Sequence, residues 1–473
     1  MKLLLAAVFL ALFVGCSKQE NAAPTEGSSH AEATADLPGI DARTNRLSRK
    51  EFFARIYVPA YEQVGKKDPR WDEAAKAYLN ILAAEAGEEE HNHDAEHEKV
   101  IQAAREKVIA SGCKDPLVRY MILRQTRDPW RAHEEGTNDW VQVAHELDGS
   151  GYHQYWKFFS YKRAAQALKS GSPRTNSPAV VHYRSETSTR LVQLVKDYTL
   201  PASVMYEAVN SWINEDLSSA KNLREWTYQQ IEPAMMQGWG DRVEPHIIRG
   251  AFNIKYAWDA RGGGWASTVP EDGWEKMRER LGIARRSLSA AWAIEPQETI
   301  ARQMLSVELG DSQGRPAMEM WFNRAMQVNP ASYEACEAKL YWLMPKWHGS
   351  REDVIAFGRE CLTNKNGNVP LILQEGHRQL ATWHEQSGKG KKDDYWKLPG
   401  VWEDCKASFE AFFANNPDGI GWRHNYALAA YKCEKWNDLR KQIKLLGPVN
   451  YSYFGGKEAF DEMVRKAEEM GRE

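Results

Sequence analysis

The chain has no large excess of charge of either sign, and it lacks motifs that mark common catalytic sites. Lysine and arginine number 62 and aspartate and glutamate 65, so the formal net charge is −3 at pH 7. This balance gives neither a basic field for nucleic acid nor an acidic tail. No HExxH motif is present, and no cysteine stands beside a histidine in a recognisable local motif. We therefore expect no nucleic-acid binding, no cofactor and no enzymatic activity, with a dispersed active site as the alternative.

The longest apolar run, Leu3–Val14, is also too short to cross a bilayer. As a helix it would span roughly 18 Å, against a hydrocarbon thickness of about 30 Å. Lys2 precedes the run, and Phe13–Cys16 follows the pattern of a bacterial lipoprotein signal. We expect residues 1–15 to be removed as a signal peptide and Cys16 to carry lipid. Ordinary secretion is the alternative.

The residues after Cys16 predict a tether. Segment 16–45 is rich in Ala, Ser, Thr, Gly and Glu and has almost no aromatic residues, so it cannot bury enough surface to fold. Two or three acyl chains would hold the protein firmly on a membrane. Ser17, rather than aspartate, follows Cys16, which by the proteobacterial sorting rule favours the outer membrane. We expect a folded body tethered by lipid within a bacterial cell envelope.

Apart from Cys16, the chain has five cysteines, an odd number for an oxidising compartment. Cys336 with Cys361, and Cys405 with Cys433, would each join neighbouring helices of a hairpin. Each bridge would stabilise the fold by about 3 kcal/mol if it formed without strain. The alternative is that all five cysteines, including Cys113, are buried free thiols.

Helical patterns dominate the rest of the chain, and alternating apolar runs of strand length are almost absent, so the expected class is all-α. Ser48 and Glu51 form a capping box at the start of the first helix. Gly- and Pro-rich breaks suggest soft boundaries. The expected regions are an N-terminal helical region at 46–175, a central helical region at 176–260, a repeat region at 261–450 and a C-terminal helix or tail at 451–473.

An internal repeat gives the expected architecture. Ile283–Pro296 aligns with Ala317–Pro330 at an offset of 34 residues, the period of tetratricopeptide repeats. In both segments a small residue allows close helix packing and a terminal proline ends the helix. Phe409–Pro417 repeats this ending. The spacing predicts tetratricopeptide-like helical hairpins stacked into an α-solenoid.

Three segments, Tyr256–Gly262, Trp321–Ala325 and Leu343–Ser350, carry a resemblance to a known family. Over about residues 250–365 the chain resembles a bacterial family of unassigned function that has tetratricopeptide-like repeats. It departs from the family pattern at Lys346 and His348, where Arg and Gly are usual. The resemblance implies a helical-repeat fold, no established activity and no catalytic residues.

Stacked hairpins commonly leave a continuous surface that binds other proteins. We therefore expect a protein or peptide partner in the cell envelope. Exposed aromatic or cationic residues of the repeat region are the candidate contact positions, and core packing is the competing explanation for each. The candidates are Arg261, Trp321, Tyr341, Trp342, Lys346, Trp347 and Trp422.

Metal binding is the alternative function. His91, His93 and His97 lie among carboxylates, and His93 and His97 would share one helical face. Imidazole and carboxylate ligands suit Zn²⁺ or Cu²⁺. A solvated acidic loop explains the same composition without a metal.

The glycine run after Arg261 has two interpretations. Glycines allow backbone N–H groups to approach an anion. However, Gly262–Gly264 follows no predicted strand. Its surroundings match neither the GxxxxGK[ST] pattern nor the GxGxxG pattern of phosphate-binding loops. A connecting loop is the other interpretation.

Overall fold

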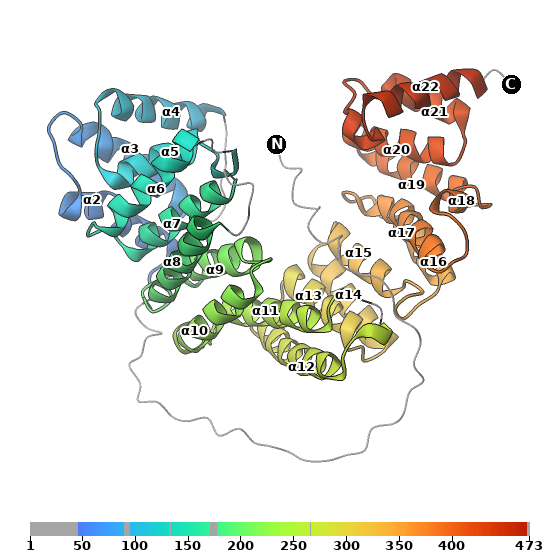
Figure 1. Ribbon diagram of the computed structural model, residues 1–473, viewed down its shortest axis with the longest axis horizontal. Coiled ribbons are helices and arrows are strands. Elements are labelled where there is room, and N and C mark those ends of the chain that lie inside the picture. The colour runs from blue at the N-terminus through green and yellow to red at the C-terminus, as the bar shows by residue number, and fades with distance from the viewer. Residues whose placement is uncertain (1–45, 89–94, 132–133, 171–176, 265, 471–473) are drawn as a thin grey trace, which may run out of the picture. The chain divides into compact units, whose positions relative to one another are not determined.

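The computed structural model describes residues 46–88, 95–131, 134–170, 177–264 and 266–470. Within these ranges every regular element is a helix, and no strand is present. The all-α class is therefore confirmed (Figure 1). None of the described helices combines the length and the apolar content that crossing a membrane requires.

The chain forms two structural units that divide between Phe252 and Asn253, inside helix α11 (Val243–Arg261). We call them the N-terminal unit and the C-terminal unit. The boundary expected near residue 261 lies at the end of this same helix. The break expected near 175 instead lies within the N-terminal unit, where the flanking helices α7 (Gln154–Ser170) and α8 (Pro178–Leu194) pack against each other.

The N-terminal unit is built from helices that pack mainly against their neighbours in sequence. Its first helix begins with the expected capping box: Glu51 N donates to Ser48 Oγ at 3.2 Å, and Ser48 N donates to Glu51 Oε2 at 2.9 Å. The other helices of the unit that precede α11 follow in order. The helices are α1 (Arg49–Ile56), α2 (Val58–Val64), α3 (Asp72–Gly87), α4 (Ala95–Ala110), α5 (Pro116–Thr126), α6 (Glu134–Asp148), α7 (Gln154–Ser170), α8 (Pro178–Leu194), α9 (Ala202–Asn210) and α10 (Lys221–Trp239).

Large aromatic side chains fill the core of this unit, and Trp140, Trp156 and Trp212 are fully buried. A π-helical turn, Ser211–Asp216, follows α9. It brings Asp216 against α7, where Gln166 Nε2 donates to both carboxylate oxygens at 3.0 Å. The buried polar groups of this turn therefore have partners, as buried polar groups generally require.

The C-terminal unit is a succession of helices with two kinds of contact. Consecutive helices pack together, and α13 also packs on α15, as α15 does on α17. Such contacts between alternate helices are typical of stacked hairpins. The helices are α12 (Glu271–Ile294), α13 (Glu298–Gly310), α14 (Arg315–Val328), α15 (Tyr333–Trp342), α16 (Arg351–Cys361), α17 (Ile372–Gln386), α18 (Lys392–Tyr395), α19 (Val401–Asn415), α20 (Ile420–Lys432), α21 (Trp436–Leu445) and α22 (Lys457–Met470).

The 34-residue offset has a clear counterpart in this unit. Helices α12 and α14 end at Ile294 and Val328, which are 34 residues apart. Ala291 and Ala325 take corresponding buried places near these ends. The two small residues of the repeated pattern are thus both buried at equivalent positions near the helix ends.

A tight corner separates α15 from α16 and accounts for much of the Leu343–Ser350 motif. His348 N donates to Trp342 O at 3.2 Å, and the two rings stack with centroids 4.7 Å apart. A Cβ atom added at Gly349 would lie 2.2 Å from the carbonyl oxygen of Leu343. Glycine is therefore required by the close approach of the chain to itself.

Candidate functional site

Burial corrects the prediction that Trp321 and Trp342 contact a partner. Their exposed fractions are 5% and 3%. The Trp321 ring packs edge to face against Trp292 of α12 at 5.6 Å. Trp342 Nε1 donates to the backbone oxygen of Glu308 in α13 at 3.2 Å. Both side chains fill space between helices and are not available to a partner in the folded chain.

Arg261 is also buried, with an exposed fraction of 3%, so it too is corrected as a contact position. Its guanidinium group lies among the rings of Trp258, Trp274 and Trp347, at 6.0, 5.4 and 5.7 Å from their centroids. It donates hydrogen bonds to the carbonyl oxygens of Gly262 and Gly264. The glycine segment thus offers carbonyl oxygens to a cation, which favours a structural loop over an anion cradle.

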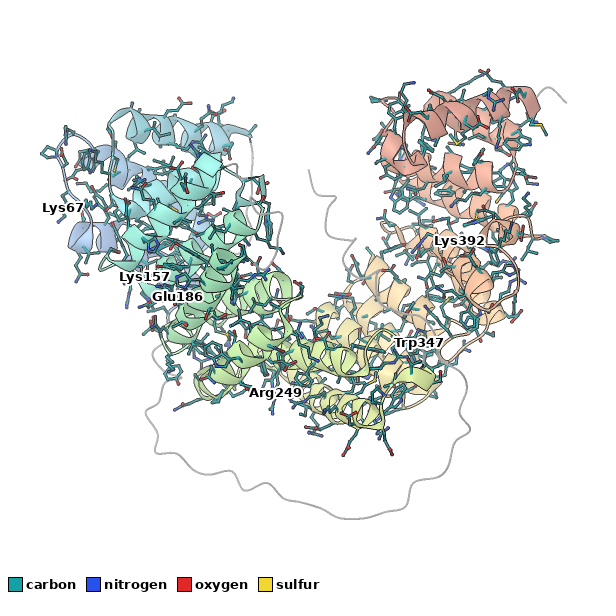
Figure 2. All side chains as sticks on the ribbon, viewed as in Figure 1. Lys67, Lys157, Glu186, Arg249, Trp347 and Lys392 are labelled. Atoms are coloured by element: carbon teal, nitrogen blue, oxygen red, sulfur yellow. The ribbon has the colours of Figure 1, made fainter. Side chains whose placement is uncertain are left out.

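The remaining candidates differ in position. Lys346 is buried, which corrects it as a contact residue, and burial lowers its pKa to about 8. Its Nζ atom lies 4.4 Å from the centroid of Tyr341, which is half-buried. Trp347 is also half-buried and lies in the corner between α15 and α16 (Figure 2). Trp422, on α20, is half-buried against Phe412 at 6.2 Å.

The histidine cluster is only partly described. His91 and His93 lie outside the described residues, while His97 lies on α4 and is half-buried. Within the described ranges, no group of three or more His, Cys, Asp or Glu side chains is arranged to hold a metal ion. The metal hypothesis for His91, His93 and His97 stays a prediction.

One serine motif needs the structure for its interpretation. Gly310–Gly314 reads GDSQG and matches the GxSxG pattern of hydrolase nucleophile elbows, although our expectation of no enzymatic activity took no account of it. A nucleophile elbow follows a strand, whereas this segment follows helix α13. Ser312 Oγ accepts a hydrogen bond from Gly314 N at 3.0 Å, and among the described residues no hydrogen bond joins it to a histidine. The segment is a turn and does not present an activated nucleophile.

A hollow of about 350 Å³ lies beside the connection between α18 and α19. Trp396, Trp402, Pro399 and Lys435 form part of its wall, and Cys433 contributes a thiol. Burial raises the pKa of this thiol to about 12, so it stays protonated. Because the thiolate is the reactive form of cysteine, the hollow has no activated sulfur nucleophile.

The strongest candidate site lies where α15 packs on α17. Tyr333 and Glu337 are one turn apart on α15, and Glu375, Arg378 and Gln379 lie at i, i+3 and i+4 on α17. We call these five residues the α15–α17 strip. They lie on two helices that are in contact although α16 separates them in the sequence.

An ion pair between half-buried Arg378 and buried Glu375 organises the α17 half of the strip. Arg378 donates to both oxygens of Glu375, at 2.6 Å from Nε and 2.5 Å from Nη2. Gln379 Nε2 donates to Glu375 Oε1 at 3.0 Å. Glu375 is only 7% exposed, so its carboxylate needs partners within the protein. Arg378 and Gln379 of the same helix supply the opposite charge and the hydrogen bonds.

Glu337 is different, because it has no ion pair or hydrogen bond with another described residue. Its pKa is raised to about 7: burial is the largest cause, the nearby Glu375 carboxylate adds to the rise, and Arg378 opposes it. Burial also raises the pKa of Tyr333 well above its usual value. The Glu337 carboxyl therefore gains and loses its proton near neutral pH. Such a shift, set by burial and a specific charged neighbour, is characteristic of functional sites.

Gln379 adds a second unsatisfied acceptor. Its Oε1 atom is buried and has no hydrogen-bond donor within the described ranges. The amide orientation is fixed, because Nε2 is engaged by a carboxylate, which can only accept. A buried acceptor without a donor is costly. The strip therefore has acceptors in excess of donors and suits a ligand that brings N–H groups or a cation.

Sequence reasoning did not find this strip. One signal was present, since Glu375, Arg378 and Gln379 have the spacing at which helical side chains meet. The pairing with Glu337 depends on the contact between α15 and α17, for which the sequence contains no marker. No protein-family model matches the chain, and it has no match among curated proteins or solved structures.

Proposed function

We propose that this chain is a lipid-anchored docking protein of the bacterial cell envelope. In this proposal the C-terminal unit is a tetratricopeptide-like array, and the α15–α17 strip binds an extended peptide segment of a protein partner. The packing of α13 on α15 and of α15 on α17 supports the array, because stacked hairpins place every second helix side by side. The resemblance to a family with such repeats agrees with the same assignment.

The observation that carries the docking proposal is the surplus of acceptors in the strip. Glu337 forms no ion pair or hydrogen bond with another described residue, and Gln379 Oε1 has no donor within the described ranges. The single cation of the strip, Arg378, is already paired with Glu375. A partner segment with a lysine or arginine side chain would supply a donor and an opposite charge to the Glu337 carboxylate. The proposal therefore assigns a basic peptide segment to the strip, and it assigns binding rather than catalysis.

Fluorescence anisotropy with matched peptides tests this assignment. The peptides share one extended sequence and differ only in a central Lys, Ala or Glu. We expect the lysine peptide to bind at least about tenfold more tightly than the glutamate peptide, a difference of about 1.4 kcal/mol. Because Glu337 is ionised above neutral pH, affinity for the lysine peptide should rise from pH 6 to pH 8.

Glu337→Lys is the decisive variant, and Glu352→Lys on α16 is its control. Glu352 is exposed and the substitution changes the net charge by the same amount. We expect Glu337→Lys to abolish the preference for lysine, while Glu352→Lys keeps it. Equal loss in both variants would show only long-range charge attraction. No preference in the wild-type chain would overturn the assignment of a basic segment.

The membrane anchor is a separate part of the proposal. Cys16 would carry the lipid, and the protein would reside in the outer membrane. Metabolic labelling with a clickable fatty acid tests this directly, with Cys16→Ser as control. Label that appears on the wild-type chain and is absent from the variant supports the anchor. An unlabelled wild-type chain contradicts it.

A further inference from the structure

The hollow beside the connection between α18 and α19 has walls from two segments of the C-terminal unit. One wall comes from residues 396–400, 402 and 403, and includes the rings of Trp396 and Trp402. The other comes from the turn between α20 and α21, where Cys433 and Lys435 lie. Its volume of about 350 Å³ is that of a small binding pocket, since such pockets begin at roughly 300 Å³. The hollow is therefore large enough for a small aromatic molecule.

The turn between α20 and α21 has an unusual backbone conformation. Glu434 has a φ of 55°, and within the described ranges it is the one residue other than glycine with a positive φ. Glycine is favoured at this position after a helix, because a side chain strains the left-handed conformation. The Glu434 carboxylate pairs with Lys397 Nζ at 2.6 Å and so joins the two walls. Retained backbone strain beside a pocket points to a function for that pocket.

Trp396 leaves a buried hydrogen-bond donor without a partner. Its exposed fraction is 3%, and its Nε1 atom has no acceptor within the described ranges. A buried donor without an acceptor is costly. Because Trp396 forms part of the wall, an oxygen atom of a ligand in the hollow would supply the missing acceptor.

The charges around the hollow favour an anion. Lys435 is exposed in the wall, and Lys432 Nζ lies 5.2 Å from the centroid of the Trp396 ring. Neither lysine forms an ion pair with another described residue, and nor does Glu403, a carboxylate in the wall. The ion pair that joins the walls is neutral. The two lysines outnumber the single carboxylate, so the surroundings of the hollow carry a net positive charge.

We propose that this hollow binds a small aromatic carboxylate. The two indole rings and Pro399 offer apolar contacts to an aromatic ring, while the Trp396 N–H group and Lys435 offer a donor and a positive charge to the carboxylate. The site binds without covalent chemistry, since the Cys433 thiol stays protonated. The inference does not depend on the docking proposal, because the residues that line the hollow include none of the α15–α17 strip.

Calorimetry with three matched ligands tests the ligand class. Naphthoate, naphthylmethanol and naphthylmethylamine share one ring system and carry a negative, a neutral and a positive group at the same ring carbon. Each is titrated into the full-length chain at neutral pH. We expect naphthoate to bind about fivefold more tightly than the alcohol, the gain from one partly exposed charge pair, and the amine to bind most weakly. An amine that binds as tightly as naphthoate, or no binding of naphthoate, would overturn the proposal.

Two lysine substitutions test the source of the preference. Lys435→Gln should remove the preference for naphthoate over the alcohol. Lys444→Gln should keep it, because Lys444 is exposed on α21 and is not among the residues that line the hollow. Trp396→Phe keeps an aromatic ring but removes the N–H donor, so it should weaken both ligands about threefold or more. Equal effects of the two lysine substitutions would overturn the proposal.

Protection of Cys433 shows where the ligand binds. Cys433 lines the hollow, whereas Cys113 is half-buried in the N-terminal unit and serves as the internal control. Folded protein is alkylated at alkaline pH with and without saturating naphthoate, and mass spectrometry follows each thiol. We expect naphthoate to slow alkylation of Cys433 several-fold and to leave Cys113 unchanged. If naphthoate binds without protecting Cys433, the ligand lies elsewhere and the proposal fails.

Discussion

His377 Nε2 lies 3.1 Å from Asp404 Oδ2, and this contact links α17 to α19 inside the C-terminal unit. Tyr395 and Arg359 complete the network. The Tyr395 hydroxyl is 2.9 Å from His377 Nδ1, and Arg359 donates to both Asp404 oxygens at 2.9 and 3.0 Å. Burial alone would raise the pKa of Asp404, but the hydrogen bonds from His377 and Arg359 outweigh it and lower the pKa. Three helices, α16, α17 and α19, thus meet at one carboxylate, and α18 joins the network through His377.

The first prediction concerns this carboxylate. Asp404→Asn should destabilise the C-terminal unit by about 2–4 kcal/mol, because it removes the charge that pairs with Arg359 and accepts from His377. Urea unfolding at neutral pH measures the loss. Asp393→Asn is the control, since Asp393 is exposed on α18. Equal effects of the two substitutions would contradict a special role for Asp404.

The same carboxylate predicts an acid dependence. Because the folded-state pKa of Asp404 is lowered below 3.8, its stabilisation is present above the unfolded value and is lost as pH falls below it. Wild-type protein should therefore lose more stability between pH 5 and pH 3 than Asp404→Asn does. Parallel acid titrations of the two proteins, followed by circular dichroism, provide the measurement. Identical losses would show that other groups carry the acid sensitivity.

Glu337 predicts a dependence of the opposite sign. Its folded-state pKa is about 7, above the ordinary 4.5, so the folded state binds the proton more tightly. Stability should fall as pH rises from about 5 to 7, by on the order of 2 kcal/mol, and level off above that range. Glu337→Gln should remove this fall, while Glu334→Gln, at an exposed position on the same helix, should keep it. Urea unfolding at pH 5 and pH 8 measures both.

The Arg378–Glu375 pair predicts a non-additive double substitution. Arg378→Met should cost about 3–5 kcal/mol, because it leaves the buried Glu375 carboxylate without its cation. Adding Glu375→Gln should restore much of the lost free energy of unfolding, because it removes the unpaired buried carboxylate charge. A double-mutant cycle by urea unfolding measures the coupling. Purely additive costs would show that the ion pair does not act as a unit.

Gly349 predicts a backbone effect. Gly349→Ala should cost about 1–3 kcal/mol, since its Cβ would press against the Leu343 carbonyl and the corner cannot easily yield. Gly421→Ala is the matched control, because nothing lies within 4 Å of the added atom on α20. There we expect a gain of about 0.4–1 kcal/mol from reduced freedom of the unfolded chain. In thermal unfolding we therefore expect Gly349→Ala to lower the melting temperature and Gly421→Ala to raise it.

Local patterns in the sequence predicted several parts of this fold correctly. The Ser48 capping box depends on residues three positions apart, and the ends of α12 and α14 depend on a repeated spacing. The burial of Trp321 was also readable, because Met318, Trp321 and Ala325 have the spacing of one helical face and are all buried. Interpreting Trp321 as a contact residue gave too little weight to that stripe.

The α15–α17 strip could not be read in the same way. Glu337 and Glu375 are 38 residues apart, and only the packing of α15 on α17 brings their charges together. No periodicity in a single helix encodes that approach.

The two halves of the strip respond differently to motion. Glu375 and Arg378 belong to one helix, so their ion pair persists when α15 shifts. Glu337 owes its raised pKa to burial and to the neighbouring helix, so hydration would return it toward the ordinary value if the helices separated. Its titration, followed by carboxyl NMR, therefore measures how closely α15 and α17 pack. This single carboxyl group would report separation of the two helices without an added probe.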